Sequence, residues 1–105
     1  MEIPLKRDEI KRAPIHPGVI FADIAMPELR KTRSIGKIAT LLGVSRQNLH
    51  KVMAGEIAIS PDMAARIGKL CGNGAGLWLR LQAKYDTWEA EHRLSKELRR
   101  IPTIG

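Results

Sequence analysis

Residues 34–53 read SIGKIATLLGVSRQNLHKVM and predict two short helices joined by a tight turn. The apolar residues of the first half recur at helical spacing, which gives that helix one apolar face. They are Ile35, Ile38, Ala39 and Leu42. Gly43 can adopt the left-handed conformation that closes a helix, and Ser45 is a favourable N-cap for the next one. With the small Ala39 at the crossing, the stretch predicts a helix-turn-helix, whose second helix can enter the major groove of DNA.

The predicted second helix has one apolar side and one polar side. Leu49, Val52 and Met53 point one way. The opposite side carries Arg46, Gln47, Asn48, His50 and Lys51. Arg, Gln and Asn make paired hydrogen bonds with the edges of guanine and adenine, whereas an ordinary solvated face more often carries Glu and Lys. A plain αα-hairpin is the alternative, and the polar side favours DNA reading over it.

The candidate DNA contacts fall into two groups. Base reading is assigned to the outer side of the second helix, near the end that approaches base edges. The base-reading candidates are Arg46, Gln47, Asn48 and His50, with Arg46 open between base and backbone. Phosphate binding is assigned to helix starts, where free N–H groups favour an anion, and to nearby cations. The phosphate candidates are Ser34, Lys37, Ser45 and Lys51.

Composition agrees with a polyanionic partner. The chain has 105 residues, enough for one domain with a single core, and 18 Lys and Arg against 11 Asp and Glu give a net charge of +7. Neutralised phosphates release condensed counterions, so a basic domain of this size suits nucleic acid. Because aromatic residues make up only 4% of the chain, aliphatic side chains must form most of the core.

Other functions receive little support from the sequence. No run of 18 apolar residues and no charged-then-apolar leader occurs, so we expect a cytoplasmic protein with no membrane partner. The single cysteine, Cys71, rules out an intramolecular disulfide and is expected to act as a small buried hydrophobe. The three histidines show no catalytic, metal-ligand or phosphate-loop spacing, so we expect no enzyme activity, metal or cofactor.

The chain divides into three parts. Residues 1–14 mix both charges between prolines and predict a flexible arm, residues 15–86 form the helix-turn-helix domain, and residues 87–105 form a helical extension. The first helix is expected to start at Pro17-Gly18 and to stop before Pro27, with a polar connection over residues 28–33.

The second half of the domain carries clear boundary signals. Gly55 is expected to end the second helix of the pair, followed by an extended loop over residues 56–59. Ser60-Pro61-Asp62 then starts a helix that closes near Gly72. Apart from short pairing of the ends or of that loop, no strand is expected. The fold class is therefore all-α, with five or six helices.

The final helix is expected to begin at Ala75 and to change character along its length. Trp78, Leu81 and Tyr85 are expected in the core. Beyond Asp86 the apolar positions thin out to a sparse stripe on a charged helix, which suits a second subunit. The dimerisation candidates are Trp88, Leu94 and Leu98.

Four motifs resemble HigA antitoxins of the lambda-repressor-like (Xre-type) helix-turn-helix group, also described as virulence-associated protein I. In order they are His16-Pro17-Gly18, Gly43-Val44-Ser45-Arg46-Gln47, Ile59-Ser60-Pro61-Asp62-Met63-Ala64 and Leu77-Trp78-Leu79-Arg80-Leu81-Gln82. The resemblance covers residues 15–88. Two positions depart from the family pattern: Val19 stands where an acid is usual, and Gly74-Ala75-Gly76 where Ser-Ala-Glu is usual.

The resemblance implies a homodimer that binds an inverted-repeat operator and represses its own operon. It also implies a HigB-like toxin partner, similar to RelE-type mRNA endonucleases. Such toxins tend to be basic, so an acidic patch is needed on this basic chain. The candidates are Asp8, Glu9, Asp23 and Glu28. The alternatives are a stand-alone or phage-type repressor without a toxin, and an interaction module that uses residues 88–101.

Overall fold

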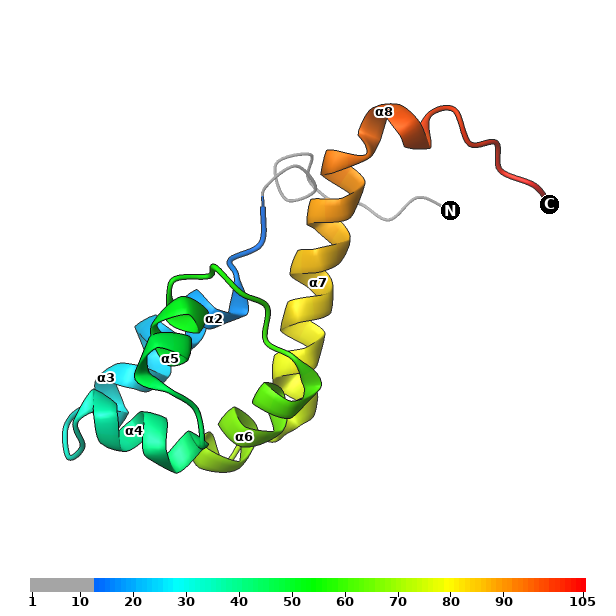
Figure 1. The fold of residues 1–105 in the computed structure, drawn as a ribbon. Coiled ribbons are helices and arrows are strands. Elements are labelled where there is room, and N and C mark those ends of the chain that lie inside the picture. Colours follow the sequence, from blue (N-terminus) through cyan, green and yellow to red (C-terminus); the bar gives the residue numbers. More distant parts are fainter. Residues whose placement is uncertain (1–12) are drawn as a thin grey trace.

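The computed structural model describes residues 13–105, and every regular element in that range is helical (Figure 1). The elements are α2 (Pro17–Ile20), η1 (Phe21–Ala25), α3 (Met26–Leu29), α4 (Ile35–Leu42), α5 (Arg46–Met53), α6 (Pro61–Cys71), α7 (Ala75–Arg93) and α8 (Ser95–Leu98). Since α2, η1 and α3 follow one another without a break, residues 13–105 form six helices. The all-α prediction is confirmed. Most of the predicted flexible arm, residues 1–12, lies outside the described residues.

The first helix runs further than predicted. It starts at Pro17 as expected, but it continues through Pro27 to Leu29. The predicted stop before Pro27 was therefore wrong, and the connection expected over residues 28–33 begins after Leu29. The reason is a π-helical turn, η1, in which the Met26 N–H donates to the carbonyl oxygen of Phe21. This wider turn sits directly before Pro27, at a point where a regular helix would need an N–H that proline lacks.

The predicted starts of α4, α5 and α6 are confirmed, because each depends on a local cap. The hydroxyl oxygens of Ser34, Ser45 and Ser60 accept hydrogen bonds from the backbone N–H three residues later, at 3.1, 3.0 and 3.2 Å. Gly43 and Gly72 end α4 and α6 with φ angles of 73° and 77°. This left-handed conformation is much less favourable for residues that carry a Cβ than for glycine. The final helix begins at Ala75 as predicted but ends at Arg93, so Leu98 lies in the separate short helix α8.

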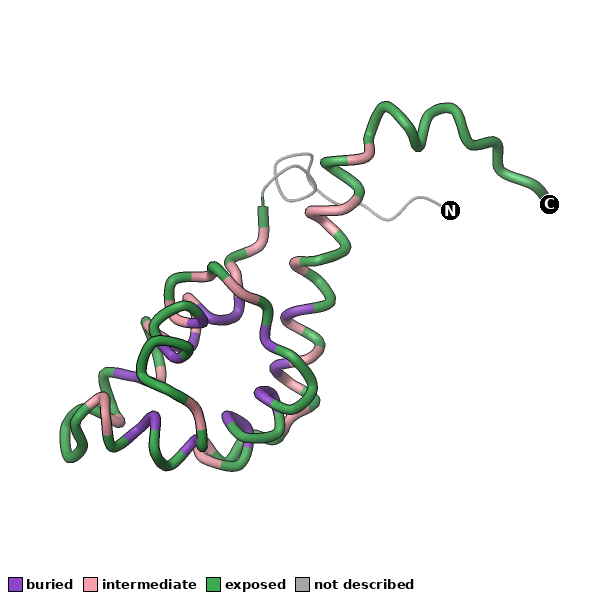
Figure 2. Tube along the Cα trace, viewed as in Figure 1, coloured by how far each residue is buried: buried purple, intermediate pink, exposed green. Residues whose placement is uncertain are grey.

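The core lies between the first helix, α4, α5, α6 and the first half of α7 (Figure 2). The predicted apolar faces are confirmed: Ile38, Leu42, Leu49 and Val52 are all buried. Phe21 and Trp78 meet edge to face at 5.9 Å between ring centres. Leu81 and Tyr85 are only half-buried at the rim of this core.

Helix α7 projects beyond this body, which gives the molecule extents of 52 × 26 × 22 Å (Figure 1). We call residues 13–86 the body and residues 87–105 the extension. No residue of the extension is buried (Figure 2). None of the helices in residues 13–105 is long and apolar enough to cross a membrane.

Candidate nucleic-acid interface

The turn between α4 and α5 is held by α6. The Val44 N–H donates to the Ala39 carbonyl at 3.0 Å, which closes the turn behind Gly43. From α6, the guanidinium of Arg66 donates to the Leu42 carbonyl at 2.9 Å. A Cβ on Gly43 would lie 2.5 Å from Nη1 of Arg66, so the glycine allows both the left-handed turn and this contact. The angle at which α5 leaves α4 is thus fixed by a third helix.

The polar side of α5 is fully presented to solvent. All five predicted polar residues, Arg46 to Asn48, His50 and Lys51, are exposed, whereas Leu49 and Val52 are buried beneath them. Four candidates surround a shallow, open hollow of about 140 Å³. They are Ser45, Gln47, Asn48 and Lys51. His50 is exposed further along the helix and does not line this hollow.

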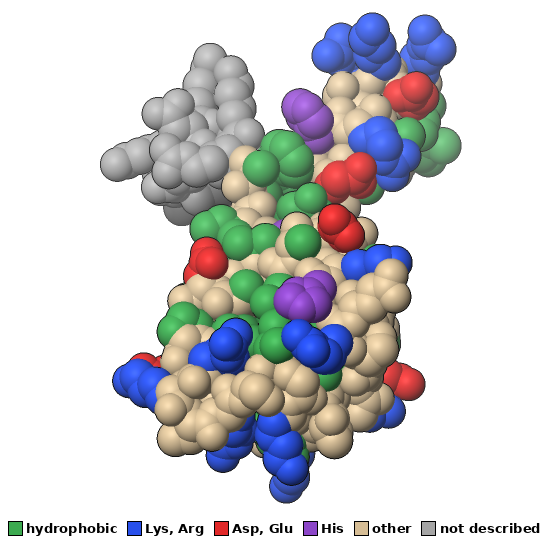
Figure 3. Space-filling model, turned by 60° about the vertical axis from the view of Figure 1, so that its left-hand side comes forward, with side chains coloured by type: hydrophobic (Ala, Val, Ile, Leu, Met, Phe, Trp, Pro, Cys, Tyr) green, Lys and Arg blue, Asp and Glu red, His purple; other side chains and the backbone are tan. Residues whose placement is uncertain are grey.

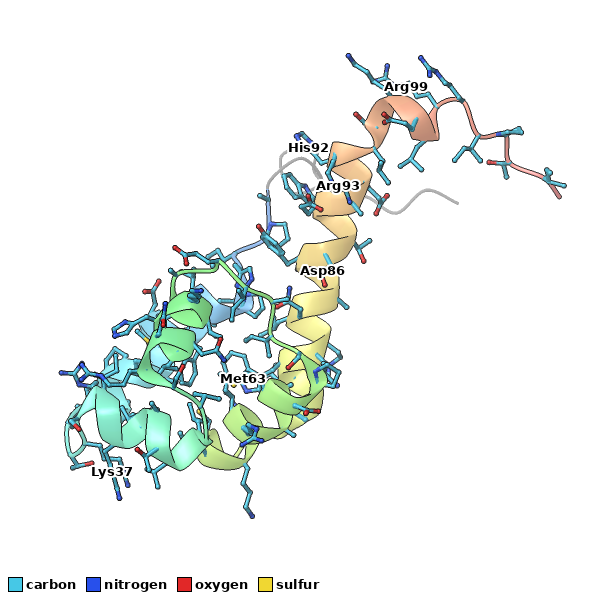
Figure 4. All side chains as sticks on the ribbon, viewed as in Figure 1. Lys37, Met63, Asp86, His92, Arg93 and Arg99 are labelled. Carbon is cyan, nitrogen blue, oxygen red and sulfur yellow. The ribbon has the colours of Figure 1, made fainter. Side chains whose placement is uncertain are left out.

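Arg46 lies against the start of α4. A Cβ on Gly36 would be 3.6 Å from Cδ of Arg46 and 3.9 Å from Oγ of Ser34. The side chain of Arg46 therefore lies over Gly36, close to the capping serine of the preceding helix. Lys37 extends from the same helix start (Figure 4). Although Ser34 and Ser45 use their hydroxyl oxygens to accept cap bonds, each hydroxyl can still donate to an anion.

The stretch of sequence that forms this pair of helices carries charge of one sign. Residues 30–53 contain six Lys and Arg and no Asp or Glu. Lys31 is paired with Glu28 at 3.0 Å, but both side chains are largely exposed, so this pair weakly offsets the positive charge. Lys and Arg side chains lie over the lower part of the body, and a separate group lies at the tip of the extension (Figure 3). The surface beside α5 suits a polyanion.

The His16-Pro17-Gly18 motif supports α5 from behind. A Cβ on Gly18 would lie 1.8 Å from the Val52 carbonyl oxygen, so only glycine allows α2 to lie this close to α5. Nδ1 of His16 accepts a hydrogen bond from the Gly18 N–H at 2.9 Å and caps α2. The expected start of the first helix at Pro17-Gly18 is confirmed. Burial lowers the pKa of His16 below its ordinary value, and the Asp86 carboxylate opposes that shift.

The motif over residues 77–82 reaches the loop that follows α5. Nε1 of Trp78 donates to Oδ1 of Asn73 at 2.9 Å, near the start of α7. One turn later, Oε1 of Gln82 accepts from the Ile59 N–H at 2.8 Å, and its Nε2 donates to Oδ1 of Asp86 at 2.8 Å. Sequence reasoning gave Gln82 no role. The sequence carried one indication of a role: Gln82 is an amide side chain among the apolar residues of a helix that was expected to pack in the core.

The remaining candidates lie away from this surface. In the extension, Trp88 and Leu94 are half-buried, Leu98 is 40% exposed, and Trp88 stacks on His92 with ring centres 4.8 Å apart. Cys71 is half-buried against the core, and burial raises the pKa of its thiol, which agrees with a hydrophobic role. Within residues 13–105 no three His, Cys, Asp or Glu side chains are grouped as metal ligands.

Comparison with known proteins identifies the family. No protein-family model matches the chain. An uncharacterised HTH-type transcriptional regulator, YbaQ of Escherichia coli K12, is 33% identical over 96 residues, which are 90% of this chain and 83% of the relative. The solved structure of Pseudomonas aeruginosa antitoxin HigA with the higBA promoter is 30% identical, with a TM-score of 0.77 over 86% of this chain and 96% of the antitoxin. The chain belongs to the HigA family of helix-turn-helix proteins.

A second solved relative agrees with this assignment. A putative antidote protein of a plasmid maintenance system from Nostoc punctiforme is 39% identical, with a TM-score of 0.72 over 90% of this chain and all of that one. The resemblance noted in the sequence is therefore confirmed. These relatives of the HigA-family protein are regulators and antidotes rather than enzymes.

Proposed function

We propose that this protein is a DNA-binding antitoxin that represses its own operon and neutralises a HigB-like toxin. The observation that carries the DNA-binding part is the exposed polar side of α5, whose Ser45, Gln47, Asn48 and Lys51 surround a shallow hollow in a region without acidic residues. The solved HigA relative with its promoter supports the same partner for this chain. The partner is double-stranded operator DNA.

In this proposal, Gln47, Asn48 and His50 read base edges, and Ser34, Lys37, Ser45 and Lys51 hold phosphates. Gln47 and Asn48 lie in the first turn of α5, the part of a recognition helix that approaches the bases. Arg46 was open between the two roles. Its side chain lies over Gly36 beside Ser34, which favours a phosphate held together with Lys37. Two cations and a capped helix start then converge on one backbone position.

The size of the site supports a homodimer. One recognition helix covers only a few base pairs, so dimers read two half-sites about 34 Å apart in an inverted repeat. A two-fold dimer needs one self-complementary surface. Trp88, Leu94 and Leu98 offer apolar area on the extension, where the body covers none of them fully.

The toxin part of the proposal depends on family membership and on acidic residues of the first helix. Asp23 and Glu28 are exposed there, although Glu28 shares its charge with Lys31, and Asp8 and Glu9 lie outside the described residues. The alternative is a stand-alone Xre-type or phage-type repressor. A neighbouring gene for a small basic protein, and co-purification of that protein with this chain, would decide for the antitoxin.

The DNA-binding proposal is tested with Gln47→Ala on the DNA upstream of the gene and on random DNA. We expect the variant to lose about 1–3 kcal/mol of binding free energy on the operator and little on random DNA, the range for one paired base contact. Lys51→Ala is expected to weaken binding to the operator and to random DNA alike. It should also reduce, by about one, the slope of the logarithm of the binding constant against the logarithm of salt concentration. Lys84→Ala removes an exposed cation from α7 and is the matched control for Lys51→Ala. It should change neither the binding to the two DNAs nor its salt dependence. Equal losses for Gln47→Ala on both DNAs would make Gln47 a phosphate contact.

A further inference from the structure

Gln82 occupies an unusual position in the fold. Of the polar side chains in residues 13–105 it alone is buried, with 5% of its surface exposed. Its Oε1 reaches from α7 to the Ile59 N–H, across 23 positions of sequence, at 2.8 Å. Ile59 is itself buried, so its N–H has no access to water if this acceptor is lost.

Ile59 belongs to the short loop that joins α5 to α6. The loop is tied to α5 at its start, where the Glu56 N–H donates to the Lys51 carbonyl at 2.9 Å. It ends at Ser60, which caps α6. The loop is therefore attached to α5 at its start, to α6 at its end and to α7 through Ile59.

Asp86 fixes the orientation of the Gln82 amide group. An amide presents an oxygen on one side and an NH₂ group on the other, and only the oxygen can accept from Ile59. Oδ1 of Asp86 accepts from Nε2 of Gln82 at 2.8 Å, which keeps Oε1 facing the loop. Figure 4 places Asp86 where α7 leaves the body, so the chain of hydrogen bonds from Asp86 through Gln82 to Ile59 begins at the boundary with the extension.

We propose that Gln82 is a positioning residue for DNA recognition, fixing the loop after α5 so that the recognition helix meets base edges in register. The inference rests on the proposed role of α5 in DNA reading. The fixed orientation matters for base contacts, which need short, directed hydrogen bonds, and much less for phosphate contacts, which tolerate displacement. Loss of Gln82 therefore reduces discrimination between operator and random DNA more than total DNA binding.

The test compares two variants of α7 in the full chain, below their unfolding temperatures. Gln82→Met keeps the length of the side chain and removes both hydrogen bonds. Trp78→Phe removes the bond to Asn73 one turn earlier and leaves the loop contact intact, so it controls for lost stability. We expect Gln82→Met to bind the operator at least tenfold more weakly and random DNA within twofold of the parent, with an unchanged salt slope. Trp78→Phe should keep operator affinity within threefold.

A rescue variant separates positioning from packing. In Gln82→Glu with Asp86→Asn, the new carboxylate still accepts from the Ile59 N–H, and the new amide at position 86 donates to the second carboxylate oxygen. Both hydrogen bonds therefore return, and only the one between positions 82 and 86 has its donor and acceptor exchanged. We expect this double variant to recover most of the lost discrimination. The proposal is overturned if folded Gln82→Met distinguishes operator from random DNA as well as the parent does. It is also overturned if Trp78→Phe loses as much operator affinity as Gln82→Met, or if the folded double variant binds the operator as weakly as Gln82→Met.

A readout without DNA distinguishes failure of this inference from failure of the proposed function. Amide hydrogen exchange at Ile59 should accelerate at least tenfold in Gln82→Met, and the amide signals of α5 should shift. Unchanged α5 signals would overturn the positioning role whatever the protein binds. If the parent protein does not discriminate its upstream DNA while these signals do move, the DNA-reading proposal fails and the mechanical link from α7 to α5 stands.

Discussion

The body and the extension are built from similar residues but use them differently. In the body, apolar residues at helical spacing from five segments meet in one core, and Phe21, Ile38, Leu49 and Ile67 have no exposed surface. In the extension, Trp88, Leu94 and Leu98 are also large and apolar, yet none is buried. The difference is the opposing surface: the body contains several helices to cover each face, and the extension is a single helix with a short continuation.

This comparison separates the apolar residues in the first half of α7 from those in its second half and in α8. The first half of α7 contributes Trp78 and Gln82 to the body, and the second half leaves it. Residues of the first half should therefore control the stability of one chain. Residues of the second half should control association between chains.

The largest effect is expected where the body is packed most closely. In Gly18→Ala the new Cβ would lie 1.8 Å from the Val52 carbonyl oxygen, so α2 must move away from α5. We expect the free energy of unfolding to fall by about 3 kcal/mol, at the upper end for overpacking. Gly76→Ala is the control, because its Cβ would meet only the flexible tip of Arg80 at 3.0 Å. Urea unfolding followed by circular dichroism measures both, and a Gly18→Ala variant as stable as the parent would contradict this packing.

Ala39→Leu tests the crossing of α4 and α5. Ala39 is 2% exposed, so a larger side chain has no free space at this position. We expect a loss of about 2 kcal/mol in the free energy of unfolding. Leu41→Ala, on the same helix but 48% exposed, should change stability by less than about 0.5 kcal/mol. An unchanged thermal midpoint for Ala39→Leu would mean that the helices do not touch there.

Much of the body could be predicted from sequence because its determinants are local. Ser34, Gly43 and Ser45 act on groups within five residues of themselves, and the apolar faces of α4 and α5 follow from spacing alone. The exposed polar side of α5 follows from the same spacing.

What could not be predicted depends on distant contacts. The continuation of the first helix through Pro27 needs a π turn, which has no sequence signature comparable to a cap. The role of Gln82 depends on Ile59, 23 residues earlier, and the motif gives no indication of that partner. DNA contacts of individual side chains are also set by the partner's geometry, so their division into base and phosphate contacts stays a prediction.

The extension is tested by Trp88→Ala combined with Leu94→Ala. We expect the dimer dissociation constant to rise about tenfold to thirtyfold, or about 1–2 kcal/mol, as truncated anchors leave an interface. Stability of the body should change little, because neither residue is buried in one chain. Sedimentation over a range of concentrations measures association. Ile24→Ala, which removes a 70% exposed side chain from η1, is the control. A dimer that survives the double variant would place its interface on the first helix or the loop over residues 56–59.

The smallest effect is expected at His16, where the two regions meet beside Asp86. Nδ1 of His16 can accept from the Gly18 N–H only while it is unprotonated, and burial lowers the pKa of this side chain below 6.5. Between pH 6.5 and the lower pKa of the folded state, the unfolded chain binds more protons than the folded one, so stability falls as the pH falls through that window. The contribution of His16 is therefore complete above pH 6.5 and decreases in mild acid. His16→Asn retains an oxygen acceptor for the cap and cannot titrate. Urea midpoints at about pH 7.5 and pH 5 should differ more for the parent than for His16→Asn, and equal differences would show that protonation of His16 does not oppose folding.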